Sequence, residues 1–393
     1  MSAEALERAI KAGVAKLPAL ARRYLEETHF DARTWSHLGS SIGTTTDATA
    51  RRAERNVVRG DYAWPHEFAA MGTWSESDRA LWKKRGDALL AQGKVATIVM
   101  AGGMATRMAG VVKALMPLDG NVNFLDARLA IEHSRIGGKT EMRPLWLMTS
   151  LATHTALEHF VNKKDRKETI RLFQQDMGVR FSGAGEVWLD GAGAAGLSAA
   201  GHGCLIDAVR RSGLLRDFIA QGGEYVFIVN IDNIAATLDP AILGWLASQP
   251  TAPGLVEVCD RLSSDRGGVV LHNNATGFDE IVEEFRLPRG FIGSDSAIFN
   301  TNTFLVRADV LQHTKVTEAW LEVEKKVDER SVIQFERLIQ ELTAAVPMLY
   351  LRVPREGVAT RFLPIKDTVD LTMKAKEIRA LLAASDAREA RCP

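Results

Sequence analysis

Cysteine is scarce in this chain of 393 residues, which has only Cys204, Cys259 and Cys392. Their spacing forms neither a CxxC pair nor a zinc-binding pattern, and an odd number of distant cysteines is typical of reduced thiols. We therefore expect a cytoplasmic protein. The sequence also lacks an apolar run of the ~18 residues that a membrane-spanning helix needs. Its N-terminus, residues 1–17, has no apolar core followed by a cleavage site.

Net charge is absent as well, because 49 Lys and Arg residues balance 49 Asp and Glu residues. A neutral balance argues against a nucleic-acid partner or a membrane-surface patch, although local basic clusters can still bind phosphates. With 46% hydrophobic and 25% charged residues, the composition is that of an ordinary globular protein.

Two common nucleotide-binding fingerprints are missing. The chain contains no GxGxxG followed by an acidic residue, which disfavours a Rossmann oxidoreductase. It also lacks the GxxxxGK[ST] pattern of P-loop proteins.

The order of apolar and polar segments predicts an α/β protein in three parts. Residues 1–93 are mostly helical, and their last helix begins at Ser75 or Ser77 and ends before Gly93. From Val95 onward, short apolar strands alternate with amphipathic helices, as expected for βαβ units in a largely parallel sheet. We take 94–345 as the catalytic domain and 346–393 as a C-terminal extension of strands and a helix.

Several local predictions follow from the same patterns. Residues 201–223 are expected to form one helix that stops at a Gly-Gly pair, and residues 331–346 an amphipathic helix. A hairpin is expected across 267–285, with its turn at Asn-Asn-Ala-Thr-Gly. An apolar strand is expected directly before Lys366.

The first segment that suggests chemistry is MAGGMATRMAGVVK, residues 100–113. Glycines such as Gly102 and Gly103 let backbone N–H groups approach a phosphate closely, and Thr106 belongs to the same loop. Arg107 and Lys113 could neutralise phosphate charge. A tight turn with solvated cations explains the spacing equally well.

Three later positions are suggestive in the same way. Asp232 ends an apolar strand in the segment NIDN, where α/β proteins form ligand sites, and its carboxylate could hold Mg²⁺ or simply cap a turn. His202 stands between two glycines and could donate to a phosphate oxygen, or be structural. Lys366 could reach a site or be solvated.

Taken in order, these segments resemble the UTP-dependent sugar-1-phosphate uridylyltransferases, which include UDP-glucose and UDP-N-acetylhexosamine pyrophosphorylases. The resemblance runs from Val95 to Leu371. It rests on MAGGMATRM with Lys113, PLWLMTSLATH (144–154), FQQ (173–175), GHG (201–203), NIDN (230–233), GGVV (267–270), EEFRLP (283–288), IFNTN (298–302) and RFLPIK (361–366).

The resemblance implies a Rossmann-like, GT-A-like fold with a mixed, mostly parallel sheet flanked by helices. It also implies substrates, namely a nucleoside triphosphate and a sugar 1-phosphate, and the cofactor Mg²⁺ at Asp232. The implied catalytic residues are Lys113, Lys366, Arg107 and Asp232. The implied nucleotide contacts are Gly102, Gly103, Thr106, Gly201 and one of Gln174 and Gln175. The implied sugar-phosphate contacts are His202, Asn230, Glu284 and Asn302.

The implied chemistry suits these residue types. An anionic sugar-phosphate oxygen attacks the α-phosphorus of UTP, with glucose 1-phosphate favoured as the sugar, and pyrophosphate leaves. Since the nucleophile is already charged, catalysis consists mainly of positioning and charge neutralisation.

The chain also departs from the family pattern. The family loop usually has Gly where this chain has Ala105, and again near Ala109. The approach to GHG, residues 190–200, lacks the usual Pro. Few residues follow RFLPIK, so we expect no counterpart here of the C-terminal β-helix domain that the resemblance implies. Another nucleotide, another sugar or cyclitol phosphate, or an inactive nucleotide-sugar-binding regulatory protein therefore stays open.

Overall fold

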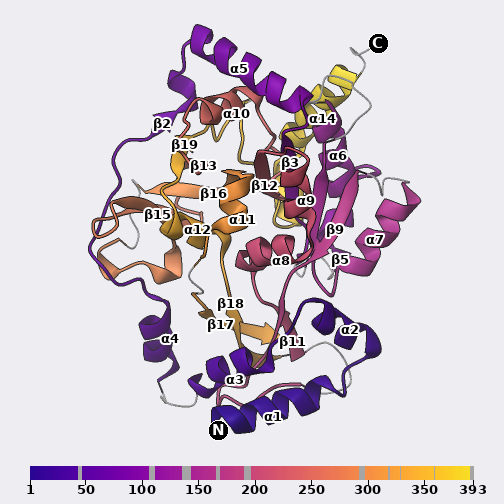
Figure 1. Cartoon of the computed structure of the whole chain (residues 1–393), viewed down its shortest axis with the longest axis vertical. Coiled ribbons are helices and arrows are strands. Elements are labelled where there is room, and N and C mark those ends of the chain that lie inside the picture. Colours follow the sequence, from indigo (N-terminus) through magenta and orange to yellow (C-terminus); the bar gives the residue numbers. More distant parts are fainter. Residues whose placement is uncertain are drawn as a thin grey trace.

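The structure is a computed structural model. It describes residues 1–42, 47–105, 111–134, 143–164, 169–189, 196–291, 297–316, 319–327, 329–357 and 359–389. Figure 1 shows a large sheet with helices on both faces, above a smaller layer made of the first helices and two hairpins. Within the described ranges, no helix is both long enough and apolar enough to cross a membrane.

One half of the large sheet is parallel, with strand order β12-β3-β8-β9. All six residues of β3 are buried, as expected for a strand covered on both faces. The bounds of these strands are Val95–Met100 (β3), Leu145–Thr149 (β8), Ile170–Gln174 (β9) and Tyr225–Asn230 (β12).

The other half adds β16 antiparallel to β12, followed by β13, β19 and β2. The pairings of β13 with β19 and of β19 with β2 are parallel again. The predicted mixed, mostly parallel sheet is therefore confirmed. These strands are β2 (Ala69–Ala70), β13 (Gly254–Asp260), β16 (Ile298–Arg307) and β19 (Leu349–Arg352).

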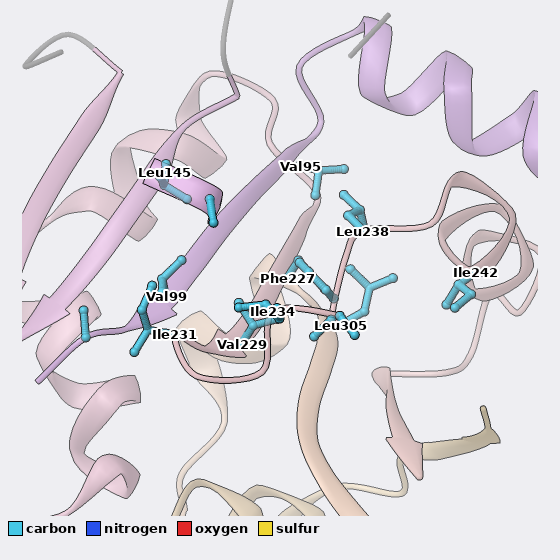
Figure 2. Packing of buried hydrophobic residues seen from close by; sticks show 14 of the residues in the cluster. Val95, Val99, Leu145, Phe227, Val229, Ile231, Ile234, Leu238, Ile242 and Leu305 are labelled. Atoms are coloured by element: carbon cyan, nitrogen blue, oxygen red, sulfur yellow. The ribbon is translucent and has the colours of Figure 1, made fainter. Parts of the chain in front are cut away.

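Two sets of helices cover the two faces of the sheet. One apolar cluster joins the sheet to the helices α6 (Phe124–Ser134), α7 (His154–Lys163), α10 (Pro240–Ala247) and α14 (Ala375–Glu389). Figure 2 shows part of this core. The opposite face packs against α8 (Leu205–Arg211), α9 (Leu214–Ala220), α11 (Ala308–His313) and α12 (Leu342–Ala345). Alternate residues of the strands point to the two clusters.

The N-terminal region contributes to both layers. Helices α1 (Ala3–Val14), α2 (Ala19–Glu27) and α3 (Ala32–Ser40) pack on β10 (Met177–Val179), β11 (Leu197–Ala199) and β18 (Arg330–Glu336). Helix α4 (Ala48–Asn56) and strand β1 (Tyr62–Ala63) follow. Helix α5 (Glu76–Ala91) is capped by Ser75, and Gly93 has φ +68° just beyond its end, as predicted. Helix α5 lies on α10 so closely that a Cβ at Gly86 would be 1.8 Å from the carbonyl oxygen of Pro240.

The predicted hairpin is confirmed as β14 (Gly268–Asn273) and β15 (Phe278–Glu283), whose residues pair from Asn273 and Phe278 outward. Strand β14 also pairs with β16 at Val269 and with β1 at His272 and Asn273, which joins the hairpin to the large sheet. Helix α13 (Thr368–Met373) precedes α14. A further short hairpin consists of β6 (Pro117–Asp119) and β7 (Val122–Asn123).

Three local predictions are wrong. Residues 331–336 belong to β18, which pairs with β17 (Leu321–Val327), because Ile333 and Phe335 alternate toward the N-terminal helices. The single helix over 201–223 is broken at Gly213, whose φ of +79° ends α8 before α9 begins. The segment before Lys366 is irregular and makes one isolated bridge, between Asn233 and Pro364.

Candidate active site

A large cleft of about 1030 Å³ opens at the carboxyl ends of β3, β8 and β12. Ligand sites in α/β proteins form at this edge of the sheet. The opposite wall comes from the smaller layer, namely from α2, the β10–β11 hairpin and the β17–β18 hairpin (Figure 1). Its polar members are Arg180, Ser198, Lys325, Lys326, Gln334 and Glu336.

The glycine loop forms part of the sheet-side wall. After β3 the chain enters a small hairpin of β4 (Met104–Ala105) and β5 (Val111–Val112). Gly102 and Gly103 line the cleft, and a Cβ at exposed Gly103 would meet no atom within 4 Å. Ala105 pairs with Val111 as a strand residue, which requires no positive φ. Thr106 and Arg107 lie outside the described residues.

The two adjacent glutamines have different surroundings. Gln175 lines the cleft, is 4% exposed, and its Nε2 is the atom that a Cβ on Gly102 would approach to 2.5 Å. The side chain of Gln174 points elsewhere and donates to Glu27 at 3.1 Å. The structure thus separates a pair that the sequence left unresolved, and Gln175 is the member with access to a ligand in the cleft.

Lys113 and Asp232 meet across the mouth of the cleft. The Lys113 Nζ atom lies 2.7 Å from Asp232 Oδ2, and both residues line the cleft. Asp232 follows β12, as the strand pattern predicted, and its backbone carbonyl accepts a hydrogen bond from Ile365. Among the described residues, no group of three or more His, Cys, Asp or Glu side chains is arranged to hold a metal ion.

A second cavity of about 160 Å³ adjoins the cleft. Both are lined by His202, Asn230 and Asp232, so the two spaces meet at these residues. Lys366 and Asn302 line only the smaller cavity. Two of its walls, Phe299 and Phe362, are aromatic and in ring contact with each other. A cavity lined by both polar side chains and aromatic rings suits a small polyhydroxylated ligand.

Asn302 is presented to the small cavity by a β-bulge. The pairing of β16 with β13 shifts register between Glu257 and Val258, which leaves Thr301 and Asn302 outside the ladder. Asn302 has φ +58°, an uncommon value for a residue with a side chain. Its buried Oδ1 makes no hydrogen bond within the described part of the chain. Strain together with an unused acceptor is typical of a ligand-binding position.

The carboxylate in the small cavity belongs to Glu283 rather than to its neighbour Glu284. Glu283 lines the cavity and accepts from Gln340 Nε2 at 2.7 Å, whereas Glu284 points away to pair with Arg261 at 2.8 Å. Burial raises the pKa of Glu283 to about 7, with the neighbouring carboxylate of Glu284 adding to the effect. Glu283 is the last residue of β15, and Glu284 begins the 3-10 helix η6 (Glu284–Arg286), so the end of the strand separates the two adjacent glutamates.

The glycines of GHG serve backbone packing. A Cβ at Gly201, where φ is +87°, would lie 2.2 Å from the carbonyl oxygen of Arg337. A Cβ at Gly203 would lie 2.5 Å from the backbone nitrogen of Leu338. His202 Nδ1 accepts the N–H of Ile339 at 3.1 Å, which leaves the proton of a neutral ring on Nε2. Burial lowers the pKa of His202 to about 4.

The sequence reasoning missed several residues that line these cavities. Gln340 and Arg266 line the small cavity, while Arg180 and Lys325 line the far wall of the cleft. They come from hairpins and connecting segments whose apposition depends on the tertiary fold, so no short motif marks them.

Residues 74–388 match the family model described as UTP–glucose-1-phosphate uridylyltransferase (UDPGP). The chain belongs to this family. The resemblance drawn from the ordered motifs is confirmed, including the position of the NIDN and RFLPIK segments within the matched range.

Curated relatives of the UDPGP family include the UTP–glucose-1-phosphate uridylyltransferases of Encephalitozoon cuniculi and Hordeum vulgare. The first is 29% identical over 297 residues, which cover 71% of this chain and 57% of the relative. The second is 29% identical over 309 residues, which cover 74% and 63%. The chain therefore spans roughly three fifths of the length of these relatives.

Two solved structures illustrate the shared fold. A mutant UDP-glucose pyrophosphorylase from Leishmania major, in complex with UDP-glucose, aligns with a TM-score of 0.71 at 21% identity, covering 94% of this chain and 78% of the other. A UDP-glucose phosphorylase from Trypanosoma brucei aligns with a TM-score of 0.70 at 18% identity, covering 94% and 77%. These alignments support the Rossmann-like nucleotidyltransferase fold.

Proposed function

We propose that this protein transfers a uridylyl group from UTP to glucose 1-phosphate and releases pyrophosphate. The observation that carries the proposal is the meeting of two cavities at His202, Asn230 and Asp232. The large cleft has the size and the glycine-rich wall of a nucleotide site. The small cavity has the size and polar rim of a sugar site. Their junction is where the α-phosphate and the sugar phosphate would meet.

The chain's residues divide the binding between the two spaces. Gln175 would read the edge of the base, because its amide is buried at the cleft wall beside Gly102. Asn302 and Glu283 would contact sugar hydroxyls. A hydroxyl can donate to the unpaired Oδ1 of Asn302, and it can either donate to or accept from the carboxyl group of Glu283, whose pKa is about 7. His202 would donate from Nε2 to a phosphate oxygen as a neutral ring.

The reaction needs positioning more than proton transfer. An oxygen of the sugar phosphate forms a bond to the α-phosphorus, and the bond from that phosphorus to the oxygen bridging to the β-phosphate breaks. The electron pair leaves with pyrophosphate, and no proton has to move. Lys113 and Lys366 flank the junction on the cleft side and the pocket side, where they would stabilise the charge that accumulates during transfer.

Asp232 is a suitable protein ligand for Mg²⁺. This ion is commonly held by one or two carboxylates together with substrate phosphates and water. The Asp232 carboxylate borders both cavities and would hold an ion that neutralises phosphate charge at their junction. Lys113 would then give up its bond to Asp232 and turn toward the phosphates.

A substrate grid tests the proposal. The protein is incubated with Mg²⁺, each of the four nucleoside triphosphates and a panel of sugar and cyclitol 1-phosphates, and pyrophosphate release is measured. We expect the highest kcat/KM with UTP and glucose 1-phosphate. The other substrates are included because Ala105 stands where the family loop usually has Gly. Pyrophosphate release only with another triphosphate, or only with another sugar or cyclitol phosphate, would replace the substrate assignment. No release with any pair, combined with binding of a nucleotide sugar, would favour an inactive binding protein.

A further inference from the structure

The turn that carries Asp232 is embedded in the protein rather than exposed as an ordinary loop. Ile231, Ile234 and Leu238 are 4%, 2% and 1% exposed. Figure 2 shows these side chains among the buried residues of β3 and β12, close to Val229 and Phe227. The polar backbone of the same turn must find partners inside the protein, because a buried unpaired carbonyl is costly.

Asn233 ties this turn to the segment that carries Lys366. Its side chain is 2% exposed, and Oδ1 accepts the N–H of Leu363 at 2.9 Å. Its Nδ2 donates to the carbonyl of Arg361 at 3.2 Å. Beside it, the carbonyl of Asp232 accepts the N–H of Ile365 at 3.0 Å. The chain from Arg361 to Ile365 therefore follows the turn through three hydrogen bonds.

Two buried arginines bind the backbone of the turn. Arg361 is 4% exposed, pairs with Glu257 on β13 and donates to the carbonyl of Thr237 at 2.6 Å. Arg128 on α6 is 1% exposed and donates to the carbonyls of Asn233 and Ala236, the first at 2.8 Å. Each guanidinium thus satisfies backbone carbonyls that water cannot reach.

We propose that Asn233, supported by Arg361 and Arg128, is a positioning residue that fixes Lys366 relative to Asp232. The inference rests on the proposed function, in which both charged groups act at the junction of the cavities. Lys366 itself is exposed and follows an irregular segment, so regular secondary structure does not place it. The three bonds along the turn hold the segment up to Ile365, and the N–H of Lys366 donates to Asp370 Oδ2 at 2.7 Å on the other side. A displacement of about 1 Å at such a site can cost on the order of 100-fold in rate.

A double-mutant cycle separates positioning from general destabilisation. Asn233→Ala should lower kcat by about 10- to 100-fold with less than roughly 3-fold change in KM for UTP. In a Lys366→Ala background, Asn233→Ala should change kcat by less than about 2-fold, because its effect passes through Lys366. Independent, additive losses would overturn the proposal.

Hydrogen exchange tests the same contacts without relying on turnover. In Asn233→Ala, the amides of Leu363 and Ile365 should exchange at least about 10-fold faster than in the unmodified protein. Unchanged exchange would overturn the proposal even if kcat falls. If the unmodified protein releases no pyrophosphate with any substrate pair, the proposed function fails, whereas the exchange result still decides whether Asn233 holds the segment.

Matched variants guard against a folding defect. If Asn233→Ala does not fold, Arg361→Lys takes its place. The lysine keeps the charge opposite Glu257 but cannot bond both Glu257 and Thr237 as the guanidinium does, so we expect the same loss in kcat. Arg51→Met breaks a similar buried pair with Glu322, between α4 and β17. It should lower thermal stability yet leave the coupling between Asn233 and Lys366 intact. Loss of the coupling in Arg51→Met would show that destabilisation alone explains it.

Discussion

Lys113 Nζ and Asp232 Oδ2 are 2.7 Å apart, so the cation and the carboxylate proposed for catalysis neutralise each other. Their side chains are 13% and 24% exposed. The attraction between the two charges offsets part of the desolvation cost that each one bears in this partly buried position. In the proposed mechanism, a nucleotide phosphate would become the new partner of Lys113 and a metal ion that of Asp232, so the pair could separate without leaving either charge uncompensated.

Replacing Asp232 should therefore affect both partners. Asp232→Asn removes the proposed metal ligand and leaves the Lys113 ammonium without its carboxylate. We expect kcat/KM to fall by at least about 100-fold, measured as pyrophosphate release at saturating Mg²⁺. Asp217→Asn, at an exposed position on α9, is the control and should retain full activity. Turnover of Asp232→Asn within a few fold of the unmodified protein would remove this residue from the mechanism.

The raised pKa of Glu283 predicts that the difference in folding stability between Glu283→Gln and the unmodified protein grows with pH. Its pKa is raised to about 7 in the folded protein, above the ordinary value of 4.5. Between these values the folded state holds a proton that the unfolded chain releases, so folding stability falls as pH rises, by up to about 1.4 kcal/mol for each pH unit. Glu283→Gln removes this loss.

Thermal melts from pH 4.5 to 8 measure the effect. The melting temperature of Glu283→Gln, relative to the unmodified protein, should increase from pH 5 to pH 7 and then level off. Glu284→Gln serves as the matched control at the next position, and its difference from the unmodified protein should not follow this course. A constant offset for Glu283→Gln across the range would contradict the raised pKa.

His202 should remain neutral throughout the physiological range. Burial lowers its pKa to about 4, and the N–H of Ile339 occupies Nδ1. The sign of the linkage is opposite to that of Glu283, because stability is lost as pH falls from about 6.5, where the unfolded imidazole titrates, through 4. Ring resonances of His202 in NMR spectra should titrate below pH 5 with the Nε2-protonated tautomer above it. A midpoint near 6.5 would show an exposed ring and exclude this donor role.

The glycine loop offers a comparison of two neighbouring positions. A Cβ at Gly102 would displace the Gln175 amide, which lies 2.5 Å away, whereas a Cβ at Gly103 meets nothing within 4 Å. Gly102→Ala should raise KM for UTP by about 10-fold or more, in the range of a lost hydrogen bond to a ligand. Gly103→Ala should leave the melting temperature unchanged. Equal KM values for Gly102→Ala and the unmodified protein would separate Gln175 from base recognition.

The sequence predicted the parts of this protein that depend on local patterns. Apolar β-branched runs identified the buried strands, and the position of Asp232 after β12 followed from the apolar run that precedes it. Prediction from the sequence failed where tertiary contacts determine the secondary structure. Residues 331–336 have helix-forming neighbours, yet β18 forms because Ile333 and Phe335 complete the core beneath the N-terminal helices.

The candidate site divides in the same way. Motif order located Lys113, Asp232, His202 and Lys366, and all four line the two cavities. Between adjacent residues, however, the sequence could not choose. Gln175 and Glu283 reach the cavities, while Gln174 and Glu284 bind Glu27 and Arg261. In each pair the strand ends between the two residues, at Gln174 for β9 and at Glu283 for β15. Which of two adjacent residues faces a cavity depends on the tertiary fold around the end of the strand.

The outermost pairing of the large sheet has a consequence for how the chain is made. Ala69 in β2 lies opposite Leu351 in β19, so two short strands from distant parts of the sequence complete this edge. During synthesis the N-terminal strand leaves the ribosome long before its partner exists. The pairing of β2 therefore waits until residues 349–352 have been made, and this edge of the sheet cannot close before most of the chain has left the ribosome.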